Sequence, residues 1–182
     1  MNNVVNRLLY FAILGGLLVF VSGILFQLDQ EQFGAIFNLT GTLFTLLGLV
    51  GLYLLQAKET GVFGFISFFL FFVALALVVG VEWMATFVMP VIENIAPEML
   101  ESEPPSPIRE GYMITFLLLS ISAVLFGILS VIKGVLARIP SLILAVAAII
   151  DLLPIGIPLS LFLFGLSFAW LGFKGLKKEV EN

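Results

Sequence analysis

Two carboxylate residues, Asp151 and Glu82, stand where apolar sequence predominates, and each could bind a cation. Asp151 follows an uncharged run of 12 residues and precedes the sequence Leu-Leu-Pro-Ile-Gly-Ile-Pro at 152–158. Two prolines and a glycine within five residues break a helix. A carboxylate in the middle of a membrane helix costs about 2.5–3.5 kcal/mol, so its presence there suggests a function. With Pro154 and Pro158 beside it, Asp151 predicts an outward-facing vestibule for a cation or a polar solute.

Both carboxylates also have a purely structural interpretation. Asp151 could reach the outer lipid headgroups, or it could accept a hydrogen bond from a backbone amide that the proline turn leaves free. Glu82 precedes Trp83, and counting from the turn at Gly61 places it ~31 Å along a helix, at the outer interface. A carboxylate costs little at that depth. If Glu82 and Asp151 converge, they form a two-carboxylate outer site that binds a cation or shares a proton.

A third polar group lies in the stretch after residue 31. Asn38 and Thr42 are four residues apart and share one helix face, and Thr45 follows at a spacing of three. In membrane helices such side chains usually form hydrogen bonds between helices, which is the role we expect for them. Their alternative role is to line a pore. The candidate polar or ion site therefore comprises six residues: Asp151, Glu82, Pro154, Pro158, Asn38 and Thr42.

The residue types that are missing narrow the possible chemistry. The chain has 182 residues and contains neither cysteine nor histidine. This excludes disulfides, thiolate and imidazole chemistry, and the usual ligands of zinc and haem. We expect no cofactor, no metal centre and no enzymatic activity. An intramembrane enzyme without these residue types would need facing carboxylates or a Ser/Lys pair, and we interpret the closeness of Ser130 and Lys133 in the sequence as coincidental. The net charge of −4 argues against binding to nucleic acid.

The surrounding sequence predicts the fold that positions these residues, which is an all-α, polytopic transmembrane helical bundle. Hydrophobic residues make up 61% of the chain and charged residues 11%, and a water-soluble fold could not cover that much apolar surface. Five uncharged stretches of at least 21 residues are each long enough to cross a ~30 Å hydrocarbon core as a helix. They are residues 8–28, 32–57, 60–81, 111–132 and 152–173.

A sixth crossing depends on the residues around the proline turn. Residues 141–173 form either one kinked helix, giving five crossings, or a short helix, a turn and a full final helix, giving six. With six crossings and a cytoplasmic N-terminus, seven of the eight Lys and Arg residues lie inside, as the positive-inside rule favours. We therefore predict one domain, 1–182, in the cell membrane with both termini cytoplasmic. Its helices lie at about 8–28, 34–56, 62–84, 112–132, 141–153 and 156–173, and its long outer loop spans 91–110.

The C-terminal third carries a resemblance. The turn Arg138-Ile139-Pro140 leads into a short apolar helix, a proline turn and the closing residues Trp170-Leu171-Gly172-Phe173-Lys174-Gly175. Over roughly residues 112–178 the chain resembles a loose group of small, six-helix prokaryotic integral membrane proteins whose domains have no assigned function. The resemblance implies a fold and a membrane location, and it carries no activity.

These observations lead to two expectations about function. The first is a non-enzymatic binding, accessory or assembly component of the membrane, whose partners are the lipid bilayer and other membrane subunits or copies of itself. The alternative is a small-solute or cation transporter or channel with an outward vestibule near Asp151.

Overall fold

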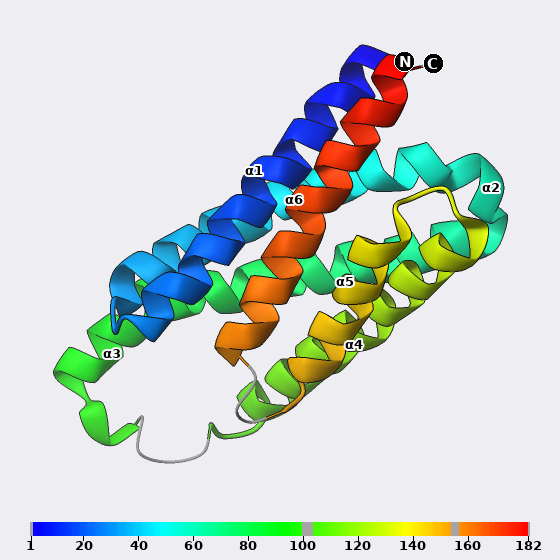
Figure 1. Cartoon of the computed structure of the whole chain (residues 1–182). Coiled ribbons are helices and arrows are strands. Elements are labelled where there is room, and N and C mark those ends of the chain that lie inside the picture. Colours follow the sequence, from blue (N-terminus) through cyan, green and yellow to red (C-terminus); the bar gives the residue numbers. More distant parts are fainter. Residues whose placement is uncertain (1, 100–103, 154–156, 182) are drawn as a thin grey trace.

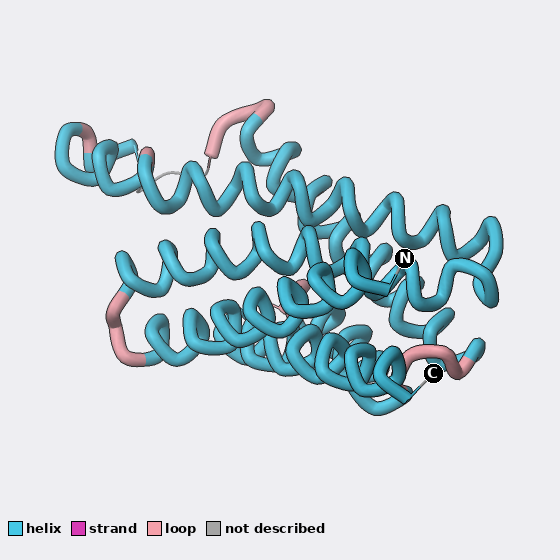
Figure 2. The backbone as a smooth tube through the Cα atoms, turned by 90° about the horizontal axis from the view of Figure 1, so that it is seen from above, coloured by secondary structure: helices cyan, strands magenta, loops and turns pink. Residues whose placement is uncertain are grey.

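The computed structural model describes residues 2–99, 104–153 and 157–181, and its elements are helices joined by short connections (Figure 1). They are α1 (Asn2–Gln27), α2 (Glu31–Phe87), α3 (Met89–Ile95), a 3₁₀ turn (Pro97–Met99), α4 (Ile108–Lys133), α5 (Arg138–Ile150) and α6 (Ile157–Glu181). The helical segments run side by side, and the loops lie at the ends of the bundle (Figure 2). The all-α prediction is therefore confirmed.

Helix α2 consists of two arms, 31–60 and 62–87, which are joined at Gly61. Gly61 has φ 58° and ψ −143°, a backbone conformation that only glycine adopts readily, and it reverses the chain. Across the two arms the rings of Tyr53 and Phe68 stack with centroids 4.3 Å apart. The sequence predicts two helices here, at 34–56 and 62–84. Their common turn is a single glycine, so the first helix continues past residue 56 to residue 60, and the second begins at residue 62.

Helix α1 packs antiparallel against α6 through small residues. A Cβ atom placed on Gly16 would lie 2.5 Å from the carbonyl oxygen of Gly165 and 2.4 Å from the backbone nitrogen of Ala169. Such close backbone contact is typical of helices that associate in lipid. The start of α1 and the end of α6 therefore lie at one end of the bundle (Figure 1), which we call the terminal end. The opposite end carries Asp29, α3 and Asp151, and we call it the loop end.

Helices α5 and α6 lie side by side and antiparallel. The Ser167 hydroxyl on α6 donates a 2.7 Å hydrogen bond to the carbonyl oxygen of Pro140, near the start of α5. Residues 141–173 are therefore not one kinked helix. The predicted bounds 141–153 shift to Arg138–Ile150, because Pro140 occupies the first helical turn, where no backbone N–H is needed. At 13 residues α5 is about 20 Å long.

The connection predicted as an outer loop at 91–110 is shorter than expected. Helix α3 occupies its beginning, because Pro90 lies in the first turn of α3, where proline is tolerated. At its far end α4 already begins at Ile108, ahead of the predicted residue 112. The final helix likewise continues beyond the predicted residue 173, to Glu181.

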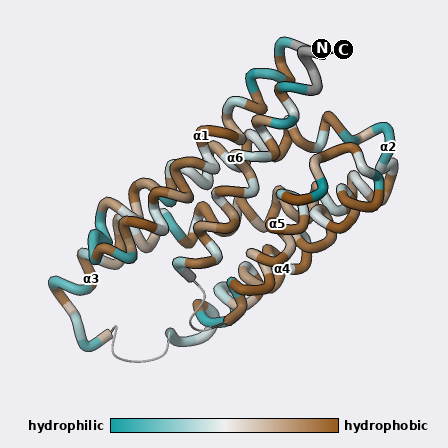
Figure 3. The backbone as a smooth tube through the Cα atoms, in the orientation of Figure 1, coloured by the Kyte–Doolittle hydropathy of each residue, from teal (hydrophilic) through white to brown (hydrophobic). Residues whose placement is uncertain are grey.

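The hydropathy of the helices fits a bilayer. Four described helices are long and apolar enough to cross a membrane, one of them the bent segment Glu31–Ile95, and α5 is a shorter apolar helix. Hydrophobic residues dominate the middle of the bundle, and hydrophilic residues gather towards its ends (Figure 3). Large apolar side chains such as Phe63, Leu117 and Ile149 are exposed on the surface. An all-helical membrane bundle explains this surface, because lipid covers it.

Candidate functional site: a two-carboxylate cavity

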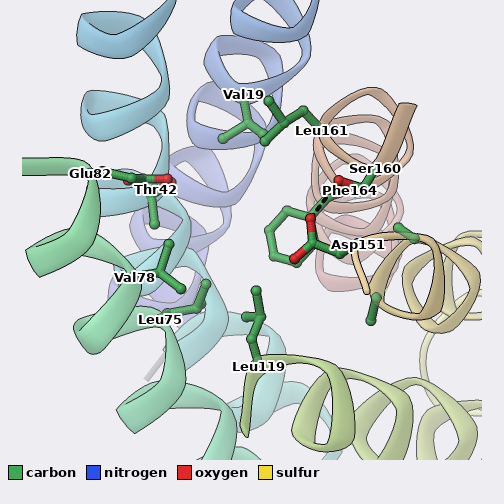
Figure 4. Close-up of a pocket in the computed structure, with 12 residues that line it drawn as sticks. Val19, Thr42, Leu75, Val78, Glu82, Leu119, Asp151, Ser160, Leu161 and Phe164 are labelled. Carbon is green, nitrogen blue, oxygen red and sulfur yellow. Dashed lines mark hydrogen bonds between the residues drawn. The ribbon is translucent and has the colours of Figure 1, made fainter. Parts of the chain in front are cut away.

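A cavity of about 50 Å³ lies between the helices of the bundle (Figure 4). Its wall is formed by both arms of α2 and by α1, α4, α5 and α6. The lining residues are Val19, Thr42, Leu75, Val78, Glu82, Leu119, Ala147, Ala148, Asp151, Ser160, Leu161 and Phe164. The two predicted carboxylates thus meet at one cavity, with Glu82 on one side and Asp151 on the other (Figure 4).

The Glu82 carboxylate is held by the first arm of α2. The Asn38 side-chain amide donates to its Oε1 atom at 2.7 Å, and the Thr42 hydroxyl donates to the same atom at 2.8 Å. The Ser22 hydroxyl on α1 in turn donates to Asn38 Oδ1 at 3.2 Å. These contacts connect α1 with both arms of α2, and the predicted interfacial depth of Glu82 stays a prediction. Hydrogen bonds of this kind fix the direction of the carboxylate.

The second oxygen of Glu82 has a different environment. Oε2 is buried, and no described residue forms a hydrogen bond with it. A buried polar atom without a partner is uncommon in folded proteins and costs about 1–3 kcal/mol, more for a charged group. The capacity of this atom to accept a hydrogen bond or to bind a cation is therefore unused.

Asp151 is held by the final helix. It follows the last residue of α5 as its C-terminal cap, and the Ser160 hydroxyl of α6 donates to its Oδ1 atom at 2.7 Å. Among the described residues its side-chain partner is thus a hydroxyl, and the predicted contacts with headgroups or with a backbone amide of the proline turn stay predictions. Glu82 is thus bound to the α1–α2 part of the bundle and Asp151 to the α5–α6 part.

The rest of the cavity wall is apolar and carries no positive charge. Among the twelve lining residues named above, the only polar ones are Glu82, Asp151, Thr42 and Ser160, and there is no Lys or Arg. Carboxylate and hydroxyl oxygens are ligands for hard cations such as Na⁺, Mg²⁺ and Ca²⁺. Within the described ranges no three His, Cys, Asp or Glu residues gather as metal ligands. A bound cation would therefore keep water in its shell, for which the cavity has room.

The remaining predicted site residues have different positions. Asn38 contacts Glu82 from behind and does not line the cavity. Pro158 lies in the first turn of α6, where its carbonyl oxygen faces Gly23 of α1, and it is not among the residues that line the cavity. Pro154 lies outside the described residues. Sequence reasoning missed Ser22 and Ser160, because single serines are frequent in apolar helices and these two have no distinguishing spacing.

Comparisons with protein-family models, curated proteins and solved structures return no match. The resemblance of residues 112–178 to small six-helix prokaryotic membrane proteins therefore stays an expectation. The assignment of function depends on the geometry of the cavity.

Proposed function

We propose that the chain is a non-enzymatic integral membrane protein with six crossings, both termini in the cytoplasm and the loop end outside. The antiparallel pairing of α1 with α6 supports an even number of crossings. The distribution of charge supports the orientation, since cytoplasmic ends are enriched in Lys and Arg. The terminal end carries the basic residues Arg7, Lys58, Lys133, Arg138, Lys174 and Lys177 beside the acidic Glu59, whereas the loop end carries the acidic residues Asp29, Glu31, Glu93, Glu98 and Glu110 beside the basic Arg109.

We further propose that the protein binds a small hard cation between Glu82 and Asp151. The observation that carries this proposal is the pair of carboxylates on one cavity whose twelve lining residues include no basic side chain. An ionised carboxylate in an apolar environment is destabilising by several kcal/mol unless a positive partner compensates its charge, so each group either takes a proton or pairs with a cation. The lining residues supply none, and a cation from solution would.

A bound cation would also connect two parts of the bundle. Its ligands would come from the second arm of α2 on one side and from the end of α5 on the other. This role fits the expected binding or accessory component and does not require chemistry on a substrate. Transport of the same cation is the second candidate, supported by the contribution of all six apolar helical segments to the cavity wall.

Unfolding of the purified protein in detergent tests the binding. A ligand at about 100 times its dissociation constant stabilises the folded state by about 2.7 kcal/mol. For a chain of this size that corresponds to a rise in Tm of roughly 5–10 °C. We expect this rise with at least one of NaCl, KCl, MgCl₂ and CaCl₂, relative to choline chloride at the same ionic strength.

Variants of the cavity provide the specificity control. Glu82→Gln and Asp151→Asn should each abolish most of the rise in Tm, because each removes one of the two charges. Glu93→Gln, on the exposed face of α3, makes the same change in charge outside the cavity and should keep the full rise. Equal salt responses in all four proteins would contradict the proposal.

A further inference from the structure

Three phenylalanines, Phe71, Phe126 and Phe168, are fully buried in the hydrophobic core of the bundle. Phe71 lies seven residues from Val78 along α2, and Phe126 lies seven residues from Leu119 along α4. A spacing of seven keeps a residue on the same helix face and moves it about 10 Å along the axis. The three side chains therefore continue the cavity-lining faces towards the terminal end. We call them the aromatic barrier.

The barrier is closely packed and contacts the cavity wall. Ring centroids of Phe71 lie 5.7 Å from Phe126 and 6.0 Å from Phe168. Phe164, which lines the cavity, has its ring 4.9 Å from Phe168 and 6.2 Å from Phe71. A hydrated cation cannot pass such a cluster, because it would lose its water without gaining polar ligands.

A second buried polar group lies beyond the barrier, near the terminal end. Gln56 is fully buried, and its Oε1 atom accepts a 2.8 Å hydrogen bond from the Ser130 hydroxyl. Its Nε2 atom is also buried and has no partner in the described part of the chain. Ser130 lies four residues from Phe126 on α4, and the buried Ser67 lies four residues from Phe71 on α2. The α2 face thus carries polar groups on both sides of the aromatic barrier, Glu82 in the cavity and Ser67 beyond it, and the α4 face carries Ser130 on the terminal side.

We propose that the aromatic barrier is the closed gate of a cation path that leads from the two-carboxylate cavity to the Gln56–Ser130 pair. This inference rests on the proposed cation site and adds a route and a direction to it. Cations enter the cavity from the loop end, and the barrier separates them from the cytoplasmic side. Hydrophobic constrictions gate channels in this way, since a small widening admits water and lowers the cost of ion passage.

The absence of cysteine from the sequence permits a direct test of access. Two single-cysteine variants, Leu119→Cys in the cavity and Ser67→Cys beyond the barrier, are placed in sealed vesicles of known orientation. A small cationic, membrane-impermeant thiol reagent should label Leu119→Cys from the outside only and should not label Ser67→Cys from the outside. Labelling of Ser67→Cys from the outside, or failure to label Leu119→Cys from that side, would overturn the inference.

Opening of the barrier gives the second test. Phe71→Ala should raise the leak of the stabilising cation into protein-containing liposomes by about tenfold, which corresponds to a barrier lowered by about 1.4 kcal/mol. Phe69→Ala on the lipid-exposed face of the same helix is the matched control and should leave the leak unchanged. Phe71→Val, a smaller change, should act in the same direction if Phe71→Ala does not fold.

The two proposals fail in different ways. A folded Phe71 variant that binds the cation but leaks no more than the Phe69→Ala control overturns the gate and leaves the binding site intact. If none of the tested cations raises the Tm of the unmodified protein, the binding site itself is overturned.

Discussion

Thr42 and Thr45 offer a matched pair of substitutions on one helix. Both side chains are buried, with exposed fractions of 4% and 0%, and valine replaces threonine in each case with little change in volume. Thr42 donates a 2.8 Å hydrogen bond to Glu82, whereas the Thr45 hydroxyl is buried without a partner among the described residues. The two substitutions should therefore change the free energy of unfolding in different directions.

The expected magnitude depends on the charge of Glu82. Hydrogen bonds between membrane helices contribute about 0.6 kcal/mol on average and at most about 1.7 kcal/mol. A hydrogen bond to a charged group contributes about 1.5–3 kcal/mol. With Glu82 ionised, Thr42→Val should destabilise the protein by about 1.5–2 kcal/mol. Thr45→Val should be neutral or stabilising by up to about 1 kcal/mol, because it removes an unpaired buried hydroxyl.

Unfolding by sodium dodecyl sulfate in mixed micelles measures both effects. Repeating Thr42→Val in a Glu82→Gln background completes a double-mutant cycle, in which the effect of the valine should fall to about 0.6 kcal/mol once the charge is gone. Equal effects of Thr42→Val and Thr45→Val would refute the assigned hydrogen-bond network. An unchanged effect in the Glu82→Gln background would refute the ionised carboxylate.

Three glycines give further predictions that the same unfolding assay can check. Gly165→Ala should destabilise the protein by about 1–3 kcal/mol, because the new Cβ would lie 2.5 Å from the carbonyl oxygen of Gly16. Gly80→Ala, with no atom within 4 Å of its Cβ, should instead be neutral or stabilising by up to about 1 kcal/mol, and a loss equal to that of Gly165→Ala would contradict the packing. Gly61→Ala should cost about 1–3 kcal/mol through its positive φ alone, since its Cβ also meets nothing, and an unchanged stability would contradict the reversal at this residue.

The helices could be predicted from the sequence because lipid imposes a minimum length on apolar segments. The uncharged stretches located the long helices, but their ends depended on local features that hydropathy does not register. Pro140 is an example: it looked like a residue before a helix and is part of the first turn of α5. The turn at Gly61 was predicted, but its reduction to one residue depends on a single backbone conformation, which composition alone does not specify.

The candidate site was predictable where charge made a residue conspicuous. Asp151 and Glu82 stand out in apolar sequence, and the spacing of Asn38 and Thr42 placed them on one face. That both amide and hydroxyl bind Glu82 could not be predicted, because it depends on how the arms of α2 pack after the turn. Ser160, the partner of Asp151, gave no sequence signal. The aromatic barrier was hidden for the same reason, since nineteen phenylalanines are spread through the chain.

Equilibrium dialysis of the purified protein against the cation that raises Tm most tests the central claim directly. The two-carboxylate cavity predicts one bound cation per chain, with binding lost in both Glu82→Gln and Asp151→Asn and retained in Glu93→Gln. Binding that survives either cavity substitution, or that is absent from the unmodified protein, would contradict a cation site between Glu82 and Asp151.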